Sequence, residues 1–474
     1  MKLARRCIIK LKLFDKEDFM NYVINAMNYV LSFEVYVMLP ILMLIICMIV
    51  KMKFLDALKH SLTLGIGFFG IFMVFDAFVA KMGPVIEIIA KKSGQERAIL
   101  DVGWPPLAAA AWTFRLVPIL IILFILINAL MLIFKWTNTI NIDVWNFWHF
   151  IFVGQMVFYT SGNLWMSGFS AILSMILVLK FGDWSAPRAE EMTKIPGIAI
   201  TTLTGVCYYP YALAMDWILS RIPVIKKING NPEHIRERFG FFGDPMFIGL
   251  IIGTGLGIAA DYDFKETANL GISVMAVVFL LPRMAGILGE GLMPISEETK
   301  KYILTKFPTM HDARIGMDLA VVIGNPATIA TGILVMPMAV ILSLILPGVD
   351  FIPVGDLPNL IPAGAFIVIA MRGNIFRSVI SYIPIIIGHL YFATALSGFF
   401  TKITLESEIR ITNFNGNITS FLDGGNLFRN YLHALFTGST WTYMLVPIML
   451  VLIWIAYRSY KKDELRMQES KKTV

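Results

Sequence analysis

The chain is a succession of long apolar runs separated by short polar stretches. Ten to twelve of these runs approach the roughly 20 residues that a helix needs to cross a bilayer. The pattern predicts an all-α polytopic membrane protein with roughly ten to twelve transmembrane helices. The clearest runs are 35–50, 62–80, 116–133, 145–160, 164–179, 247–260, 268–281, 329–346, 360–371, 379–400 and 443–457.

The same pattern of apolar and polar positions occurs twice. An acidic residue precedes an apolar run at Glu34 and again, 210 residues later, at Asp244. Each half then reaches a short break centred on a glycine, Gly103 or Gly316. Irregular backbone persists at membrane depth only where protein or a water-filled cavity satisfies its polar groups. The duplication therefore predicts two repeats, inverted relative to each other, with a binding site where the breaks meet.

Two segments that each begin with a proline, 84–92 and 294–306, are too polar to span the membrane. We expect them to form interfacial helices that lead into re-entrant hairpins at 101–113 and 314–328. The whole chain then divides into an N-terminal amphipathic segment (1–33), a first transmembrane repeat (34–181), an irregular element with a cytoplasmic loop (182–243), a second transmembrane repeat (244–400), a polar extracytoplasmic excursion (401–439) and a last helix with a basic cytoplasmic tail (440–474).

Composition supports the membrane interpretation, because 57% of the 474 residues are hydrophobic and only 15% are charged. A soluble domain could not cover so much apolar surface. The net charge of +7 comes from basic residues that flank the apolar runs, as the positive-inside rule predicts, so it does not indicate nucleic-acid binding. Lys51 and Lys53 follow the first run and conflict with an equally basic N-terminus, which leaves the orientation of the first helix open. Three widely spaced cysteines predict neither a disulfide nor a metal site.

Polar side chains near the bilayer centre are costly, so each one is a candidate for function. Asp318 follows Gly316 at the tip of the second break and is expected to contact substrate, although it could instead cap a helix. Asp101 opens the first break, where a capping role is the stronger alternative. Trp104 could offer a flat wall to a sugar ring or simply pack. His149 and Asn146 fall on one helix face and could share a polar pocket.

Further candidates lie at two other irregular points. Thr201 and Thr202 could offer hydroxyl groups to a polyol, and Asn325 either breaks or caps the helix after the second hairpin. The sequence has no nucleophile triad, phosphate-binding loop or metal cluster, so we predict no catalytic residue, metal or cofactor. The run of glycines from Gly253 to Gly257 lacks a βαβ context and is interpreted as helix packing.

Taken together, several motifs resemble the galactitol family of phosphotransferase-system IIC components, within the ascorbate–galactitol permease superfamily. They extend in order over nearly the whole chain: Asp101-Val-Gly-Trp-Pro105, Asn141-Ile-Asp-Val-Trp-Asn-Phe-Trp-His149, Arg238-Phe-Gly-Phe-Phe-Gly-Asp-Pro245, Ile315-Gly-Met-Asp318 and Arg372-Gly-Asn-Ile-Phe-Arg377.

The resemblance implies a homodimer in the lipid of the bacterial cytoplasmic membrane, with a scaffold and a core that moves as an elevator. It implies a polyol or sugar as substrate. A separate IIB protein would phosphorylate the sugar from a phosphocysteine, and IIA would supply IIB. By resemblance to the ascorbate relatives, the site would be lined by His149, Thr201, Thr202, Asp318 and the segment around Gly65 and Gly67.

The chain departs from the family pattern beside that site. Thr201-Thr202 stands where Pro-His is expected, Leu319 where some galactitol permeases have proline, and Asn325 where they have histidine. Galactitol, another hexitol, a pentitol and a sugar acid therefore all stay open as substrates.

Two other classes of function are weighed against a phosphotransferase permease. An ion- or proton-coupled symporter of similar fold would need an intramembrane carboxylate on a proton path, for which Asp318 is the candidate. An intramembrane transferase or hydrolase would need a clustered acid and base or a metal set, and the sequence shows none.

Overall fold

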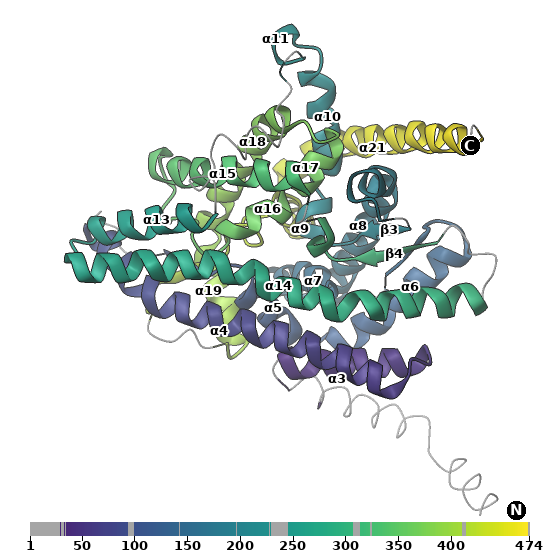
Figure 1. Ribbon diagram of the computed structural model, residues 1–474, viewed down its shortest axis with the longest axis horizontal. Helices are drawn as coiled ribbons and strands as arrows, with labels where there is room; N and C mark the ends of the chain where they lie inside the picture. Colours follow the sequence, from purple (N-terminus) through teal and green to yellow (C-terminus); the bar gives the residue numbers. More distant parts are fainter. Residues whose placement is uncertain are drawn as a thin grey trace, which may run out of the picture.

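A computed structural model describes residues 35–92, 99–141, 143–195, 197–226, 245–306, 313–322, 325–409 and 414–472, together with Tyr29, Phe33 and Ile228. Helices dominate it (Figure 1). The first half contains α3 (Val35–Ile49), α4 (Phe54–Lys92), α5 (Pro105–Trp112), α6 (Val117–Ile133), α7 (Phe147–Ser161), α8 (Leu164–Thr193), α9 (Leu203–Val206), α10 (Tyr209–Leu219) and α11 (Pro223–Lys226). The second contains α13 (Pro245–Ala259), α14 (Phe264–Lys306), η3 (Leu319–Val322), α15 (Pro326–Ile345), η4 (Leu357–Asn359), α16 (Leu360–Ala363), α17 (Ala365–Ala370), α18 (Ile375–Ala395), α19 (Ser397–Glu406), α20 (Leu427–Phe436) and α21 (Thr440–Lys472).

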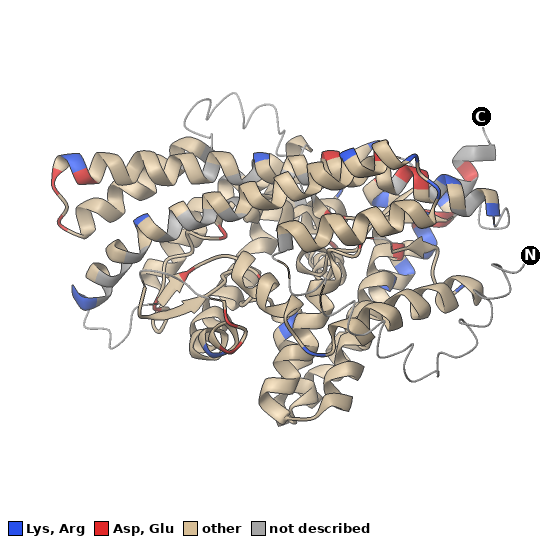
Figure 2. Cartoon of the chain, turned by 90° about the horizontal axis from the view of Figure 1, so that it is seen from below, with Lys and Arg blue, Asp and Glu red and all other residues tan. Residues whose placement is uncertain are grey.

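Several of these helices can cross a membrane. Within the described residues, four are long and apolar enough: α8, α15, α18 and α21. A fifth crossing results if α5 and α6, which meet at 93°, form one broken span. Figure 2 shows long helical stretches with few charged residues, although Arg283 lies near the middle of α14. The chain is thus a mostly helical protein with the features of a multi-pass membrane protein, whereas the larger number of crossings stays a prediction.

The polar segments 84–92 and 294–306 are not separate interfacial helices, as the sequence had suggested. They are the last turns of α4 and α14, which contain 39 and 43 residues and are each roughly 60 Å long at 1.5 Å per residue. The prolines that begin the two segments therefore lie inside continuous helices. Because lysines and glutamates at these ends can lie beyond the apolar part of the bilayer, a polar end does not require a break.

Helices α4 and α14 pack side by side and antiparallel along the molecule, with α3 beside one end and α13 beside the other (Figure 1). Lys92, at the end of α4, forms an ion pair with Asp261, just before α14. At the opposite end, Gly291 of α14 contacts the backbone of His60 and Leu64 in α4.

The two helix pairs have matching bounds. Helices α3 and α13 begin at Val35 and Pro245, and α4 and α14 begin at Phe54 and Phe264, 210 positions apart in both cases. The connecting turns also match, since Lys51 and Asp261 both adopt a left-handed conformation with φ of 64° and 59°.

Two small parallel sheets lie among the helices. In one, β1 (Ile99–Asp101) pairs with β5 (Asn417–Thr419), and Asp101 lies opposite Thr419. In the other, β4 (Arg314–Met317) lies between β2 (Thr139–Ile140) and β3 (Ile198–Ile200). Surrounding helices bury these strands, which is how extended backbone is tolerated at membrane depth. The sequence had predicted the breaks but not that they pair as strands.

Helices α7 and α8 pack closely around small residues. A Cβ on Gly154 would lie 2.9 Å from the carbonyl oxygen of Ser167, so glycine is required for this approach. The Ser167 hydroxyl donates to the Gly154 carbonyl at 2.7 Å. Small residues that bring backbones together, with hydroxyls bonded to carbonyls, are the usual means of association where lipid offers no hydrophobic driving force.

The segment 401–439 is expected to be a polar excursion outside the membrane, and this location stays a prediction. Its described part contains the end of α19, β5 and α20. Leu405 in α19 is exposed, whereas Thr419, Asp423 and Arg429 are buried and at most 4% exposed. Most of the N-terminal segment 1–33, the basic loop with Arg236 and Arg238, and the Arg238–Asp244 part of one motif lie outside the described residues.

Candidate functional site

The candidate site lies at the carboxyl ends of the three strands β2, β4 and β3. Because neighbouring parallel strands end at the same edge, the residues that follow them meet there although they are far apart in sequence. Asn141 follows β2, Asp318 follows β4, and Thr201 and Thr202 follow β3. The crevice outside the carboxyl ends of parallel strands is the usual place for ligands in α/β sheets, and the same geometry applies here.

Hydrogen bonds connect these residues directly. The Thr202 hydroxyl donates to Oδ2 of Asp318 at 3.0 Å and accepts the backbone N–H of Leu319 at 3.1 Å. The Thr201 hydroxyl donates to Oδ1 of Asn141 at 3.3 Å. The structure therefore brings together Asp318, Thr201 and Thr202, three of the residues named from sequence.

Gly316 allows the strands to close around this edge. A Cβ at this position would lie 3.1 Å from Cγ2 of Thr201 and 3.2 Å from Oδ1 of Asn141. These distances are shorter than ordinary contacts, so a side chain would push the site residues apart. Gly316 thus contributes to the site through the absence of a side chain.

Asp143 and Asn141 are site residues that sequence reasoning did not single out. Asp143 is 4% exposed, interacts electrostatically with Asp318, and accepts the side-chain N–H of Asn146 at 2.7 Å. Within the part of the chain that the structure describes, two buried polar atoms beside it have no hydrogen-bond partner: Nδ2 of Asn141 and Oδ1 of Asn146. One signal in the sequence could have pointed to these residues: the polar pattern Asn-x-Asp-x-x-Asn directly before an apolar run. This pattern was used only as a motif of the family.

Aromatic rings lie next to this polar edge. Trp104 is half-buried and contacts Trp145 edge-on, with ring centroids 5.8 Å apart. It also stacks near Trp148 at 6.3 Å, and Phe68 of α4 lies 4.2 Å from Trp145. Trp104, which precedes α5, therefore belongs to an aromatic cluster with Trp145, and Trp145 lies on the loop that carries Asp143.

His149 lies one turn into α7 and is 3% exposed. Its Nδ1 lies 2.9 Å from Nη2 of Arg429, which in turn donates to Asp423 at 2.9 Å. The Thr204 hydroxyl also donates to Asp423, at 2.6 Å. The structure thus places His149 in a buried ion-pair network, and its expected contact with substrate stays a prediction.

Asp101 belongs to the other sheet. Its carboxylate accepts N–H groups from Gly103 at 3.2 Å, Phe421 at 2.9 Å and Asp356 at 3.1 Å. Gly103 has φ of 69°, a conformation that favours glycine. This is the capping role that the sequence had left as the alternative for Asp101.

The remaining sequence candidates have local structural roles. Asn325 caps α15, where its side-chain oxygen accepts N–H groups from Ala327 at 2.9 Å and Thr328 at 3.2 Å. A Cβ on Gly65 would lie 2.8 Å from Pro40, so this glycine lets α4 approach α3. Gly67 is buried in the same helix.

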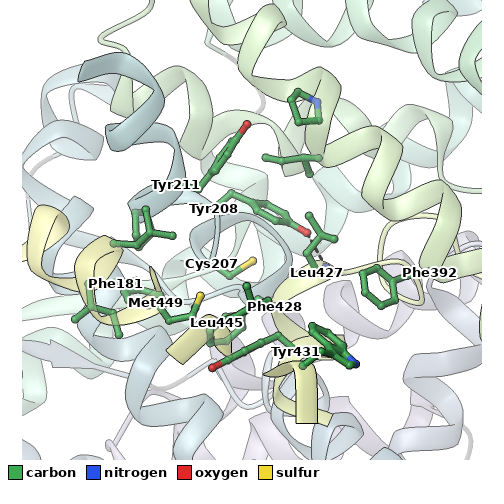
Figure 3. A pocket seen from close by; sticks show the side chains of 16 residues that line it. Phe181, Cys207, Tyr208, Tyr211, Phe392, Leu427, Phe428, Tyr431, Leu445 and Met449 are labelled. Carbon is green, nitrogen blue, oxygen red and sulfur yellow. Dashed lines mark hydrogen bonds between the residues drawn. The ribbon is translucent and has the colours of Figure 1, made fainter. Parts of the chain in front are cut away.

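A cavity of about 260 Å³ lies elsewhere, between α10, α18, α20 and α21 (Figure 3). Its lining is apolar and includes Phe181, Tyr208, Leu427 and Met449. It contains none of the candidate residues, and its chemistry does not suit a polyol. Among the described residues, no group of three His, Cys, Asp or Glu side chains is arranged to hold a metal ion.

Comparison with known proteins matches the chain to one family over most of its length. The profile described as "PTS system sugar-specific permease component" covers residues 29–414. A protein of Escherichia coli (strain K12), provisionally named a permease IIC component, is 34% identical over 404 residues, which is 85% of this chain and 91% of that protein. The galactitol-specific EIIC component of the same strain is 32% identical over 406 residues, covering 85% and 88%. The galactitol-specific EIIC component of Escherichia coli O157:H7 matches equally well.

Proposed function

Because the chain belongs to the family of sugar-specific permease components of the phosphotransferase system, we propose that it binds a neutral polyol of the galactitol kind and carries it across the bacterial cytoplasmic membrane. A separate IIB protein, itself phosphorylated by IIA, then phosphorylates the polyol. On this view the chain supplies the sugar site and the path, and no catalytic nucleophile.

One observation carries this proposal: the two buried polar atoms without partners at the carboxyl edge of β2, β4 and β3. Nδ2 of Asn141 is a donor and Oδ1 of Asn146 is an acceptor. Leaving such a group unsatisfied costs about 1–3 kcal/mol, so the edge is suited to a ligand that both donates and accepts. A polyol carries both functions on every hydroxyl, and Trp104 can pack against its carbon chain.

The charges around this edge favour a neutral substrate over a sugar acid. The carboxylates of Asp143 and Asp318 interact electrostatically, and none of the described residues gives Asp143 a cationic partner. Nearby arginines are engaged elsewhere, because Arg314 pairs with Glu190 at 2.9 Å and Arg429 with Asp423 at 2.9 Å. A negatively charged sugar would add a third charge to this pair and be repelled by both carboxylates.

The proposed architecture has two inverted repeats. It is supported by the antiparallel packing of α4 on α14 and by the matching turns at Lys51 and Asp261. Helices α3, α4, α13 and α14 would form the scaffold of a homodimer, and the two sheets with their helices would form the moving core. The Thr204 hydroxyl donates to Asp423 and the Tyr208 hydroxyl accepts from Leu427, so residues 219 positions apart meet at both points, as expected near a pseudo-twofold axis.

The function can be tested in membrane vesicles that contain the protein. Vesicles supplied with IIA, IIB and a phosphoryl donor should accumulate phosphorylated galactitol or a related hexitol. The rate should fall at least tenfold in Asp318→Asn, because the hydroxyl group bound there loses a charged acceptor.

The same vesicles separate this function from proton-coupled transport, the competing hypothesis. With IIA and IIB omitted, an imposed proton gradient should not concentrate the polyol. Accumulation of unmodified polyol under that gradient would overturn the proposal and make Asp318 and Asp143 candidates for a proton path.

A further inference from the structure

The chain builds the same turn twice, once at Asp143 and once at Asp356. In both, an asparagine three residues later donates its backbone N–H to the aspartate carbonyl, at 3.1 Å from Asn146 and 2.9 Å from Asn359. The asparagine side chain also donates to the carboxylate, at 2.7 Å and 3.2 Å respectively. A helix begins at the next residue in each case, Phe147 or Leu360. The two aspartates are therefore structural counterparts.

The Asp356 turn is closed, by which we mean that protein donors use the acceptor positions of its carboxylate. Oδ1 of Asp356 accepts the backbone N–H of Trp104 at 3.2 Å in addition to the bond from its own asparagine. Oδ2 accepts the hydroxyl of Ser420 at 2.6 Å and the N–H of Leu422 at 3.1 Å. Donors that follow each of the strands β1 and β5, together with Asn359, thus use the acceptor positions of this buried carboxylate.

The Asp143 turn is not closed in this way. Among the described residues, the donors to its carboxylate come from its own turn, Trp145 and Asn146. The backbone N–H of Asn146 is 3.4 Å from the carboxylate oxygen Oδ1, which is a long hydrogen bond. Thr201, which follows β3 as Ser420 follows β5, donates to Asn141 and not to the aspartate. A carboxylate that is 4% exposed therefore keeps acceptor capacity beside the unpartnered atoms of Asn141 and Asn146.

We propose that Asp143 binds the substrate directly and determines which hydroxyl pattern the site accepts, whereas Asp356 is its closed structural counterpart. Asp143 accepts hydrogen bonds from one or two neighbouring hydroxyls of the polyol. Nδ2 of Asn141 donates to a hydroxyl oxygen, and Oδ1 of Asn146 accepts from another hydroxyl. This assignment rests on the proposed function of the same site.

The test compares Asp143→Asn with the matched variant Asp356→Asn in purified protein without IIB. Binding of radiolabelled galactitol, mannitol and sorbitol is measured together with thermal unfolding. Asp143→Asn should bind at least tenfold more weakly with little change in melting temperature, because a charged acceptor is lost. Asp356→Asn should lower the melting temperature and leave the affinity of the folded protein within about twofold.

Deoxy analogues of the polyol that binds provide a readout that a structural role would not change. At one carbon, replacing the hydroxyl by hydrogen should lower the affinity of the parent protein for the polyol. The same replacement should have little further effect on the affinity of Asp143→Asn, since the mutation and the deoxy analogue remove the same hydrogen bond. Unchanged affinity in Asp143→Asn, or additive losses at every carbon, would overturn the role of Asp143 and leave the proposed function standing. If the folded parent binds none of the three polyols, the proposed substrate class and the role of Asp143 are both wrong.

Discussion

At the scale of single residues, the site depends as much on small residues as on polar ones. Gly316 is the clearest case, because both of its contacts are to site residues: Thr201 at 3.1 Å and Asn141 at 3.2 Å from a Cβ built there. The strands β2, β4 and β3 can bring their polar ends together only with glycine at this position.

We therefore expect Gly316→Ala to reduce polyol affinity by about tenfold, or 1.4 kcal/mol, because the added methyl group separates Thr201 from Asn141. Equilibrium binding measures the effect. Gly168→Ala is the control, since a Cβ there meets nothing within 4 Å. Equal affinities for the two variants would show that the edge can open without cost.

At the scale of elements, α21 packs against α8 and α10, but many of its apolar side chains, such as Met444 and Leu450, are exposed. Near its end, however, Asp463 is 4% exposed and accepts from Arg188 of α8 at 2.7 Å and from Arg372 at 2.6 Å. Arg372, which belongs to one of the family motifs, is thus part of this connection.

Asp463→Asn should destabilise the protein by about 3 kcal/mol, because two buried or half-buried arginines lose their shared counter-ion. The melting temperature in detergent measures this loss. Glu464→Gln provides the comparison, since it removes the neighbouring charge from a more exposed pair with Lys461 and should change stability by less than about 1 kcal/mol. Similar melting temperatures for the two variants would contradict the anchoring role of Asp463.

At the scale of the whole molecule, the matching turns of the two halves carry opposite charge. The turn between α3 and α4 has Lys51 and Lys53, whereas the turn between α13 and α14 has Asp261 and Asp263. These turns lie at opposite ends of the antiparallel α4–α14 pair (Figure 1). From the positive-inside rule we expect the lysine turn in the cytoplasm and the aspartate turn outside.

Single cysteines at Lys53 and Lys265, both exposed, test this orientation in a background with Cys7→Ser. A membrane-impermeant maleimide added to intact cells should label Lys265→Cys and spare Lys53→Cys. In inside-out vesicles the pattern should reverse. The native Cys47 and Cys207 are buried and should contribute little. Labelling of both positions from one side would exclude inverted repeats.

Part of this structure could be predicted because it depends on local physics. The apolar runs, the breaks at Gly103 and Gly316 and the choice of Asp318 and Thr202 as candidates follow from the cost of polar groups at membrane depth. Asp143 was not singled out because the polar pattern around it, with Asn141 and Asn146, served only to identify the family. Whether each carboxylate is closed depends on donors more than 50 residues away, such as Ser420 for Asp356.

Hydrophobic periodicity and short motifs are local properties, so the sequence alone was enough to identify a helical membrane protein, the breaks at Gly103 and Gly316, and the family. The pairing of the breaks as strands, the buried network of His149 and Arg429, and the different surroundings of Asp101 and Asp143 became visible only in the folded chain. The physical reason is that a buried polar group is defined by its partners. Those of Asp101 and His149 come from the opposite half of the chain, whereas among the described residues Asp143 accepts only from its own turn.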